Sequence, residues 1–139
     1  MWSSHAHAGE IADLFRHYNR RLSQQQALNF EHIVKDAGKS FGVSPNLIAA
    51  IIVVESGARP NVISKGGDYG LMQVRWKVHR KEFPWAKDIL EPKTNILIGT
   101  AIYARYFARE KTVYGALVRY SGGGKKTARK VIKIMKGEK

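Results

Sequence analysis

A single glutamate, Glu55, stands directly after an unbroken apolar run, residues 47–54, and shortly before Gly57. Ser44 and Pro45 precede the run, and a polar N-cap followed by proline in the first turn predicts a helix that starts there. A helix that is apolar on every side is buried, so Glu55 is expected at the C-terminal end of a core helix. Partial desolvation and the negative end of the helix dipole would both raise the pKa of this carboxyl. The pattern predicts a general acid that is protonated near neutral pH; the simpler alternative is a glutamate that has reached solvent as the helix ends.

A second carboxylate follows in a glycine-rich stretch, at Asp68. A general acid and a second carboxylate can divide the steps of a hydrolysis between them, so a hydrolase could use Asp68 as nucleophile or water-activating base. The alternative is an aspartate that stabilises a turn. The five histidines are scattered without metal-ligand spacing and the chain has no cysteine, so we predict neither a metal nor a cofactor.

The remaining sequence predicts a mostly helical chain around the buried helix. Ser23 and Gln26 form a capping-box pattern at the start of the second helix, and Gly38 is expected to end it. Residues 57–76 carry the helix breakers of an irregular excursion or a small β-hairpin, and a loop of this length is usually functional. A short helix is expected in the basic stretch 77–93. The predicted helices are 10–22, 23–37, 45–56, 95–109, 112–120 and 125–136.

The composition is that of one globular domain with a strong positive charge. The chain has 139 residues and a formal net charge of +13. Such a charge implies an anionic partner, and the absence of a recognisable nucleic-acid-binding motif favours a cell wall or membrane surface over nucleic acid. No apolar stretch is long enough to span a membrane, and residues 1–8 lack the apolar core of a signal peptide, which predicts either a cytoplasmic protein or a processed form.

Three segments, in order, resemble motifs of the lytic transglycosylase family, whose catalytic domain is like goose-type lysozyme. They are IIVVESG at 51–57, GLMQV at 70–74 and ALVRYSGG at 116–123. Between the last two, NILIG at 95–99 is similar to the helix that follows the family's substrate cleft. The resemblance implies an α+β lysozyme-like fold, with an N-terminal extension and helix at 1–22 and a catalytic domain at 23–139.

The resemblance also implies an activity: cleavage of the β-1,4 bond between N-acetylmuramic acid and N-acetylglucosamine, with formation of 1,6-anhydro ends. Glu55 would act as acid and then as base, while Asp68 falls at a variable position of the family pattern. The implied substrate-binding residues are Ser56, Met72, Gln73, Tyr120 and Ser121.

Two of these implied positions carry specific expectations. The hydroxyl of Tyr120 is expected to point at Glu55. Ser121 replaces the family's usual asparagine, and Gly122 replaces a common alanine. Lys130 stands where the family has a further tyrosine, whose contact would be absent or supplied by Tyr103 or Tyr114.

Two alternatives stay open at this point: a hydrolytic lysozyme that uses Glu55 and Asp68, and a non-catalytic glycan-binding module of a secretion or conjugation system. The expected partner is the peptidoglycan glycan strand, with added attraction to an anionic wall or membrane surface. We expect a monomer in the periplasm or cell envelope, a location inferred from the substrate.

Overall fold

The computed structural model describes residues 8–138. The expectation that residues 1–8 are not a signal peptide falls almost entirely on residues 1–7, which lie outside the described residues. Within the described residues, no helix combines the length and apolar character needed to cross a bilayer. The described chain is mostly helical with one small antiparallel sheet, which confirms the predicted fold class. Its helices are α1 Glu10–Tyr18, α2 Gln24–Phe41, α3 Pro45–Ser56, α4 Trp76–His79, α5 Pro92–Glu110, α6 Val113–Tyr120 and α7 Lys125–Met135, with a short 3₁₀ helix at Arg80–Glu82.

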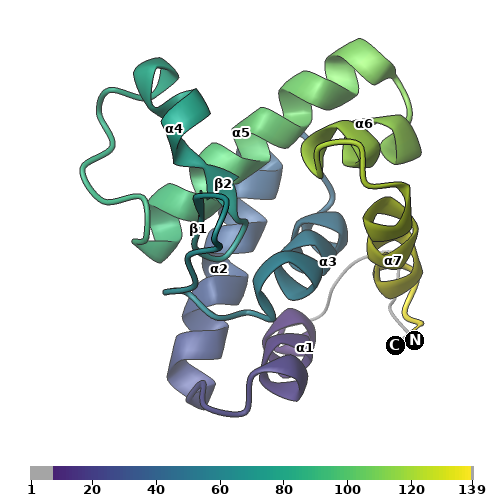
Figure 1. The fold of residues 1–139 in the computed structure, drawn as a ribbon. Helices are drawn as coiled ribbons and strands as arrows, with labels where there is room; N and C mark the ends of the chain where they lie inside the picture. Colours follow the sequence, from purple (N-terminus) through teal and green to yellow (C-terminus); the bar gives the residue numbers. More distant parts are fainter. Residues whose placement is uncertain (1–7, 139) are drawn as a thin grey trace.

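Helix α3 is the centre of the fold, as its apolar sequence predicts. Figure 1 shows it surrounded by the other helices, with α1 below it and α7 beside it. Every residue from Leu47 to Val53 is buried. The helix ends at Gly57, which takes a left-handed conformation with a φ of 63°. Its first turn carries the predicted proline, but the side chain of Ser44 makes no capping hydrogen bond.

Three helix ends differ clearly from the prediction: α5 begins at Pro92 instead of residue 95, and α1 and α2 end at other residues. Helix α2 passes through Gly38 and ends at Phe41, before Gly42. A side chain at Gly38 would place its Cβ 2.5 Å from the carbonyl oxygen of Val43, so glycine serves close packing here and not termination. Helix α1 ends at Tyr18 instead of residue 22, where Asn19 leaves the helix and its amide donates a hydrogen bond to the carbonyl oxygen of Ala58 at 3.0 Å.

Helix α1 is fixed to the rest of the fold by its N-terminus. The buried carboxylate of Glu31, in α2, accepts hydrogen bonds from the backbone N–H groups of Gly9 and Ala12, each at 2.9 Å. The apolar side of α1 joins the same core as α2 and α3. The division of the chain into an extension at 1–22 and a domain at 23–139 stays a prediction.

The excursion after α3 forms the predicted hairpin. Strand β1 (Asp68–Tyr69) pairs with β2 (Val74–Arg75) in antiparallel register, with Asp68 opposite Arg75 and Tyr69 opposite Val74. Ile63 adds one isolated bridge to Tyr69. Figure 1 shows the hairpin lying beside α3 and in front of α2.

A buried asparagine of α5, Asn95, anchors the turn of this hairpin. Its side-chain oxygen accepts a hydrogen bond from the backbone N–H of Met72 at 2.7 Å. Its amide nitrogen donates to the carbonyl oxygens of Tyr69 at 2.7 Å and Ile89 at 2.9 Å. Gly70 has a φ of 77°, and any Cβ there would lie 2.4 Å from the Asn95 amide nitrogen. The turn therefore requires both a glycine and an asparagine at these positions.

Candidate active site

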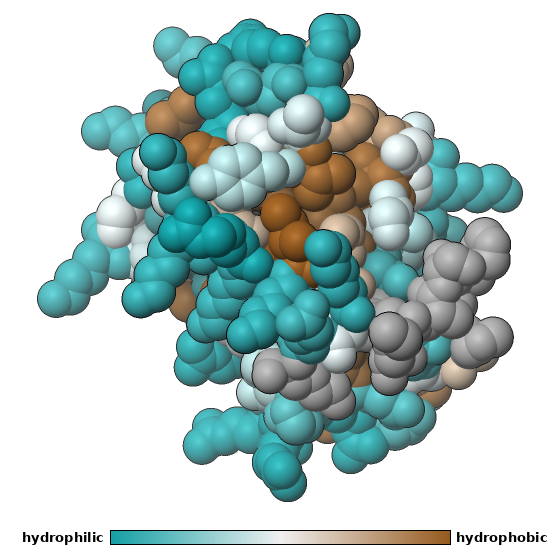
Figure 2. Space-filling view, turned by 90° about the vertical axis from the view of Figure 1, so that its right-hand side faces the viewer, coloured by the Kyte–Doolittle hydropathy of each residue, from teal (hydrophilic) through white to brown (hydrophobic). Residues whose placement is uncertain are grey.

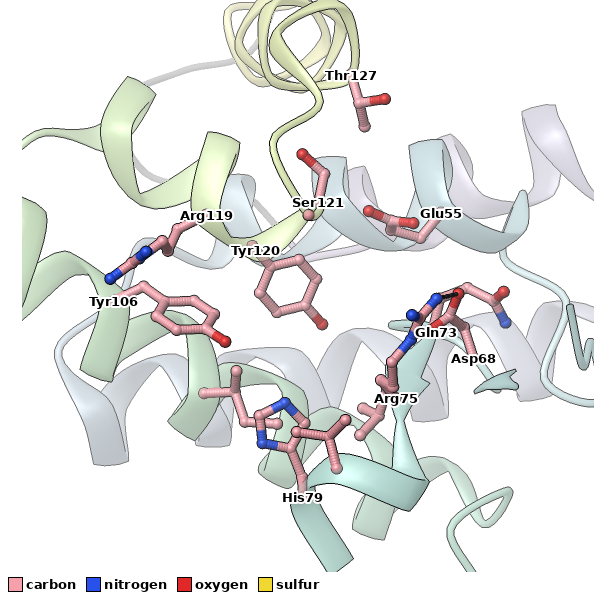
Figure 3. A pocket seen from close by; sticks show the side chains of 14 residues that line it. Glu55, Asp68, Gln73, Arg75, His79, Tyr106, Arg119, Tyr120, Ser121 and Thr127 are labelled. Carbon is pink, nitrogen blue, oxygen red and sulfur yellow. Dashed lines mark hydrogen bonds and ion pairs between the residues drawn. The ribbon is translucent and has the colours of Figure 1, made fainter. Parts of the chain in front are cut away.

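A cavity of about 440 Å³ opens beside the C-terminal end of α3. The hairpin, α4 and helices α5 to α7 complete its wall. Figure 3 shows Glu55 and the pair formed by Asp68 and Arg75 on one side, Tyr106 and Arg119 on the other, and Tyr120 between them. The cavity thus brings together groups from five parts of the chain around one carboxyl.

Glu55 is partly buried in the wall of this cavity and, among the described residues, has no hydrogen-bond or ion-pair partner. Burial raises its pKa to about 7, and the negative charge of Asp68 contributes to the rise. The second cause is thus Asp68 rather than the helix dipole that the sequence suggested. Near neutral pH a large fraction of Glu55 is protonated, and its proton is free to be donated to a ligand.

Asp68 lies in the same cavity, but its carboxylate is fully engaged. Arg75 donates to it twice, from Nε to Oδ1 at 2.9 Å and from Nη2 to Oδ2 at 3.2 Å. The hydroxyl of Ser64 donates to Oδ2 at 3.1 Å and accepts from the backbone N–H of Asp68 at 3.0 Å. Arg75 and Ser64 together hold the pKa of Asp68 below its usual range, against the effect of its burial. Asp68 is therefore an ionised carboxylate with its oxygens occupied, and it shares turn-type hydrogen bonds with Ser64.

Tyr120 lines the cavity, but its hydroxyl does not bond to Glu55 as expected. It donates to the carbonyl oxygen of Met72 at 2.7 Å. Burial raises the pKa of Tyr120 well above its usual value, and the charge of Glu55 adds to this rise. The tyrosine therefore stays protonated and ties α6 to the hairpin turn. Its ring lies between the two sides of the cavity (Figure 3).

Two of the predicted substrate-binding side chains are not among those that line the cavity. Met72 is fully buried, and its sulfur lies 3.7 Å from the hydroxyl of Thr100 and where a Cβ at Gly99 would come within 2.6 Å of it. Ser56 is buried and donates to the carbonyl oxygen of Ile52, one turn back in α3. Met72 thus supports the site through its backbone, and Ser56 completes the end of α3.

Gln73 and Ser121 do line the cavity, and both bond to nearby backbone. The amide nitrogen of Gln73 donates to the carbonyl oxygens of Val62 and Gly70, at 3.1 and 3.0 Å. The hydroxyl of Ser121 lies 2.8 Å from the carbonyl oxygen of Leu117 and 3.2 Å from that of Gly124. Each side chain shapes its part of the wall by holding a loop in place.

Sequence reasoning missed several residues of the wall. Of the expected replacements for the family's further tyrosine, Tyr103 is buried, and neither it nor Tyr114 lines the cavity. The second tyrosine of the cavity is Tyr106, and Lys130 is exposed outside it. Pairing of Arg75 with Asp68 across a hairpin was the one sequence signal that could have identified a missed residue. The missed residues with polar side chains are Arg75, His79, Tyr106, Arg119 and Thr127.

The described residues contain no group of three or more histidine, cysteine, aspartate or glutamate side chains placed to hold a metal ion.

The fold and the site define a lysozyme-like domain: a mostly helical chain with a small hairpin and one glutamic acid facing an open cavity. A sequence model described as the transglycosylase SLT domain matches residues 32–139. The chain belongs to this family.

Curated relatives agree with the family. The chain is 36% identical over 93 residues to the endo-type membrane-bound lytic murein transglycosylase A of Citrobacter koseri and to that of Cronobacter sakazakii. It is 37% identical over the same length to the protein of that name from Enterobacter sp. (strain 638). Each match covers 60% of this chain and 46% of the relative, so the chain matches about half the length of these relatives.

Proposed function

We propose that this protein is a peptidoglycan lytic transglycosylase. It cleaves the β-1,4 bond between N-acetylmuramic acid and N-acetylglucosamine and leaves 1,6-anhydromuramic ends. The observation that carries the proposal is Glu55, an acid with a pKa of about 7, without a partner among the described residues, in the wall of a cavity of about 440 Å³. Membership of the family and the names of the relatives support the assignment as a lytic transglycosylase.

The proposed reaction uses this one carboxyl twice. Protonated Glu55 donates its proton to the glycosidic oxygen as the bond to the anomeric carbon breaks, while the acetamido group of the muramic acid assists at that carbon. The carboxylate of Glu55 then removes the proton of the C6 hydroxyl, whose oxygen displaces the acetamido oxygen from the anomeric carbon and closes the anhydro ring. Glu55 is protonated again and no water is consumed. A pKa of about 7 suits both halves, because the two forms are then present in similar amounts near neutral pH.

The engagement of Asp68 favours this single-carboxyl reaction over hydrolysis. A hydrolase would need a second carboxylate to attack the sugar or to activate water. Both oxygens of Asp68 accept hydrogen bonds from Arg75, and one also accepts from Ser64, so attack would require breaking these bonds. We assign Asp68 a supporting role, in which its charge raises the pKa of Glu55.

Glycan strands of the cell wall are the proposed partner, and the periplasm or cell envelope is the proposed location. The formal net charge of +13 supports attraction to an anionic wall or membrane surface. Figure 2 views the molecule from the side on which α7 lies in Figure 1, and hydrophilic side chains dominate the rim of this face around an apolar centre. The basic side chains that α7 exposes and that contribute to this charge are Lys125, Lys126, Arg129, Lys130 and Lys133. We also propose that the protein acts as a monomer.

The proposal is tested by digesting purified peptidoglycan with the wild type, Glu55→Gln and Asp68→Asn. Wild type should release soluble fragments, and Glu55→Gln should lower the rate about 100- to 10,000-fold, as loss of a general acid does. Asp68→Asn should lose far less activity than Glu55→Gln. If Asp68→Asn were as inactive as Glu55→Gln, the hydrolytic lysozyme would replace the proposal. If the wild type bound the wall without cutting it, the non-catalytic binding module would replace it.

A further inference from the structure

The guanidinium of Arg75 is held in a fixed position at the cavity wall. Arg75 lies directly opposite Asp68 in the hairpin, and its guanidinium donates to both carboxylate oxygens of Asp68, at 2.9 and 3.2 Å. Ser64 in turn fixes Asp68 through its hydroxyl and backbone N–H. Gly66 leaves room for the guanidinium, since a Cβ there would lie only 3.0 Å from Nη2. The cationic group is therefore oriented before any ligand arrives, which lowers the cost of ordering it on binding.

Only part of this guanidinium is used within the protein. It carries five N–H donors, and its bonds to Asp68 engage two of them. The side chain is 54% exposed and lines the same cavity as Glu55. Figure 3 shows it on the Glu55 side of the cavity, next to Asp68 and across from Tyr106. The remaining N–H groups can bind a planar anion from the substrate, the ligand geometry that arginine suits best.

We propose that Arg75 is a specificity residue that binds a carboxylate carried by the lactyl arm of the muramic acid. The inference rests on the proposed function for its substrate. The sugar rings of the strand are uncharged, so the lactyl arm is the source of negative charge near the scissile bond. That charge is either the free lactyl carboxylate of a strand without peptides or a carboxylate of the attached stem peptide. Asp68 is the positioning residue for Arg75 in this proposal.

The alternative is that the pair of Asp68 and Arg75 only stabilises the hairpin, as opposite charges on neighbouring strands do. The two roles make different predictions for ligands that differ only in charge. A structural pair would affect every ligand of the cavity alike, because its loss would move the wall. A carboxylate-binding Arg75 would affect only the ligands that carry a carboxylate.

Binding measurements in a Glu55→Gln background separate these roles, because the ligands then stay uncut. Three ligands are compared by calorimetry: a muropeptide with its stem, a strand fragment stripped of peptides, and a neutral N-acetylglucosamine oligomer. Arg75→Gln should weaken binding of one or both charged ligands about tenfold, as loss of a charge-assisted hydrogen bond does, and leave the neutral oligomer within about twofold. The charged ligand that loses affinity identifies the source of the carboxylate. Equal loss for all three ligands, or no loss for any, would overturn the proposal.

Two further variants complete the design. Arg20→Gln removes one exposed positive charge at a position that does not line the cavity, and it should leave the affinity for all three ligands within about twofold. Asp68→Asn keeps the guanidinium while releasing it, so it should weaken the charged ligands less than Arg75→Gln does. Losses as large as those of Arg75→Gln would overturn direct binding by Arg75. Because binding is read without bond cleavage, a wild type that hydrolyses the strand would overturn the proposed reaction and leave this inference standing.

Discussion

Replacing Glu55 by glutamine should stabilise the protein by an amount that grows with pH. In the folded chain the pKa of Glu55 is raised from 4.5 to about 7, because the carboxyl is buried and faces the charge of Asp68. A raised pKa means that the folded state binds the proton more tightly than the unfolded state does. The contribution of protonated Glu55 to the unfolding free energy is therefore fully present below pH 4.5, and it is lost as the pH rises through about 7. The shift corresponds to about 3 kcal/mol of unfolding free energy, of which about 2.5 kcal/mol falls between pH 5 and pH 8.5.

Urea unfolding of both proteins, followed by circular dichroism at pH 5 and pH 8.5, measures this effect. Glutamine resembles the neutral carboxyl and cannot ionise, so the stability of Glu55→Gln relative to wild type should increase by about 2.5 kcal/mol between the two pH values. Taking the difference removes the titration of all other groups. Glu138→Gln at an exposed position is the control for loss of any carboxylate charge. A difference that stays constant, or that decreases with pH, would refute a raised pKa at Glu55.

Three other substitutions test the surroundings of the acid. Asp68→Asn removes a negative charge that contributes to the raised pKa of Glu55, so the alkaline limb of the profile of kcat/KM against pH should move to lower pH. An unmoved limb would show that the charge of Asp68 does not raise this pKa. Asn95→Ala leaves the backbone N–H of Met72 and two carbonyl groups without their partner, so it should lower the unfolding free energy measured in urea by about 2–4 kcal/mol. A loss below about 1 kcal/mol would contradict this expectation. Gly99→Ala would place a Cβ 2.6 Å from the sulfur of Met72. It should cost about 1–3 kcal/mol and lower the Tm, and a Tm equal to that of wild type would show that the contact relaxes freely.

The parts of the fold that follow from local patterns could be predicted from the sequence. The apolar run before Glu55 predicted a buried element, and Pro45 at its start with Gly57 at its end identified that element as a helix. The glycine-rich stretch that follows gave the hairpin excursion. The end of α1 could not be predicted, because Asn19 is placed by its contact with Ala58. For α2 the local pattern offered two glycines, and only the close packing of Gly38 against Val43 distinguishes it from Gly42, which takes the left-handed conformation and ends the helix.

The cavity shows the same division between local and distant causes. The resemblance to the family implied that Glu55 and Gln73 share one cleft, and both side chains line the cavity. It was not enough to decide where the hydroxyl of Tyr120 points, because its acceptor, the carbonyl of Met72, is positioned by Asn95 and by close packing on α5. Helical spacing also cannot select among tyrosines on the same helix. The sequence suggested Tyr103, and the register of α5 places Tyr106 in the cavity instead.

In the proposed reaction Glu55 is the one carboxyl that acts, and the sugar's own C6 hydroxyl takes the place of water. Digestion of purified peptidoglycan in water enriched in oxygen-18, followed by mass spectrometry of the released fragments, shows whether water enters the product. The new muramic acid ends should be one water lighter than ordinary reducing ends and carry no oxygen-18. Ends that contain one oxygen-18 atom for each bond cut would contradict the proposed reaction, because they would show that water attacks the anomeric carbon.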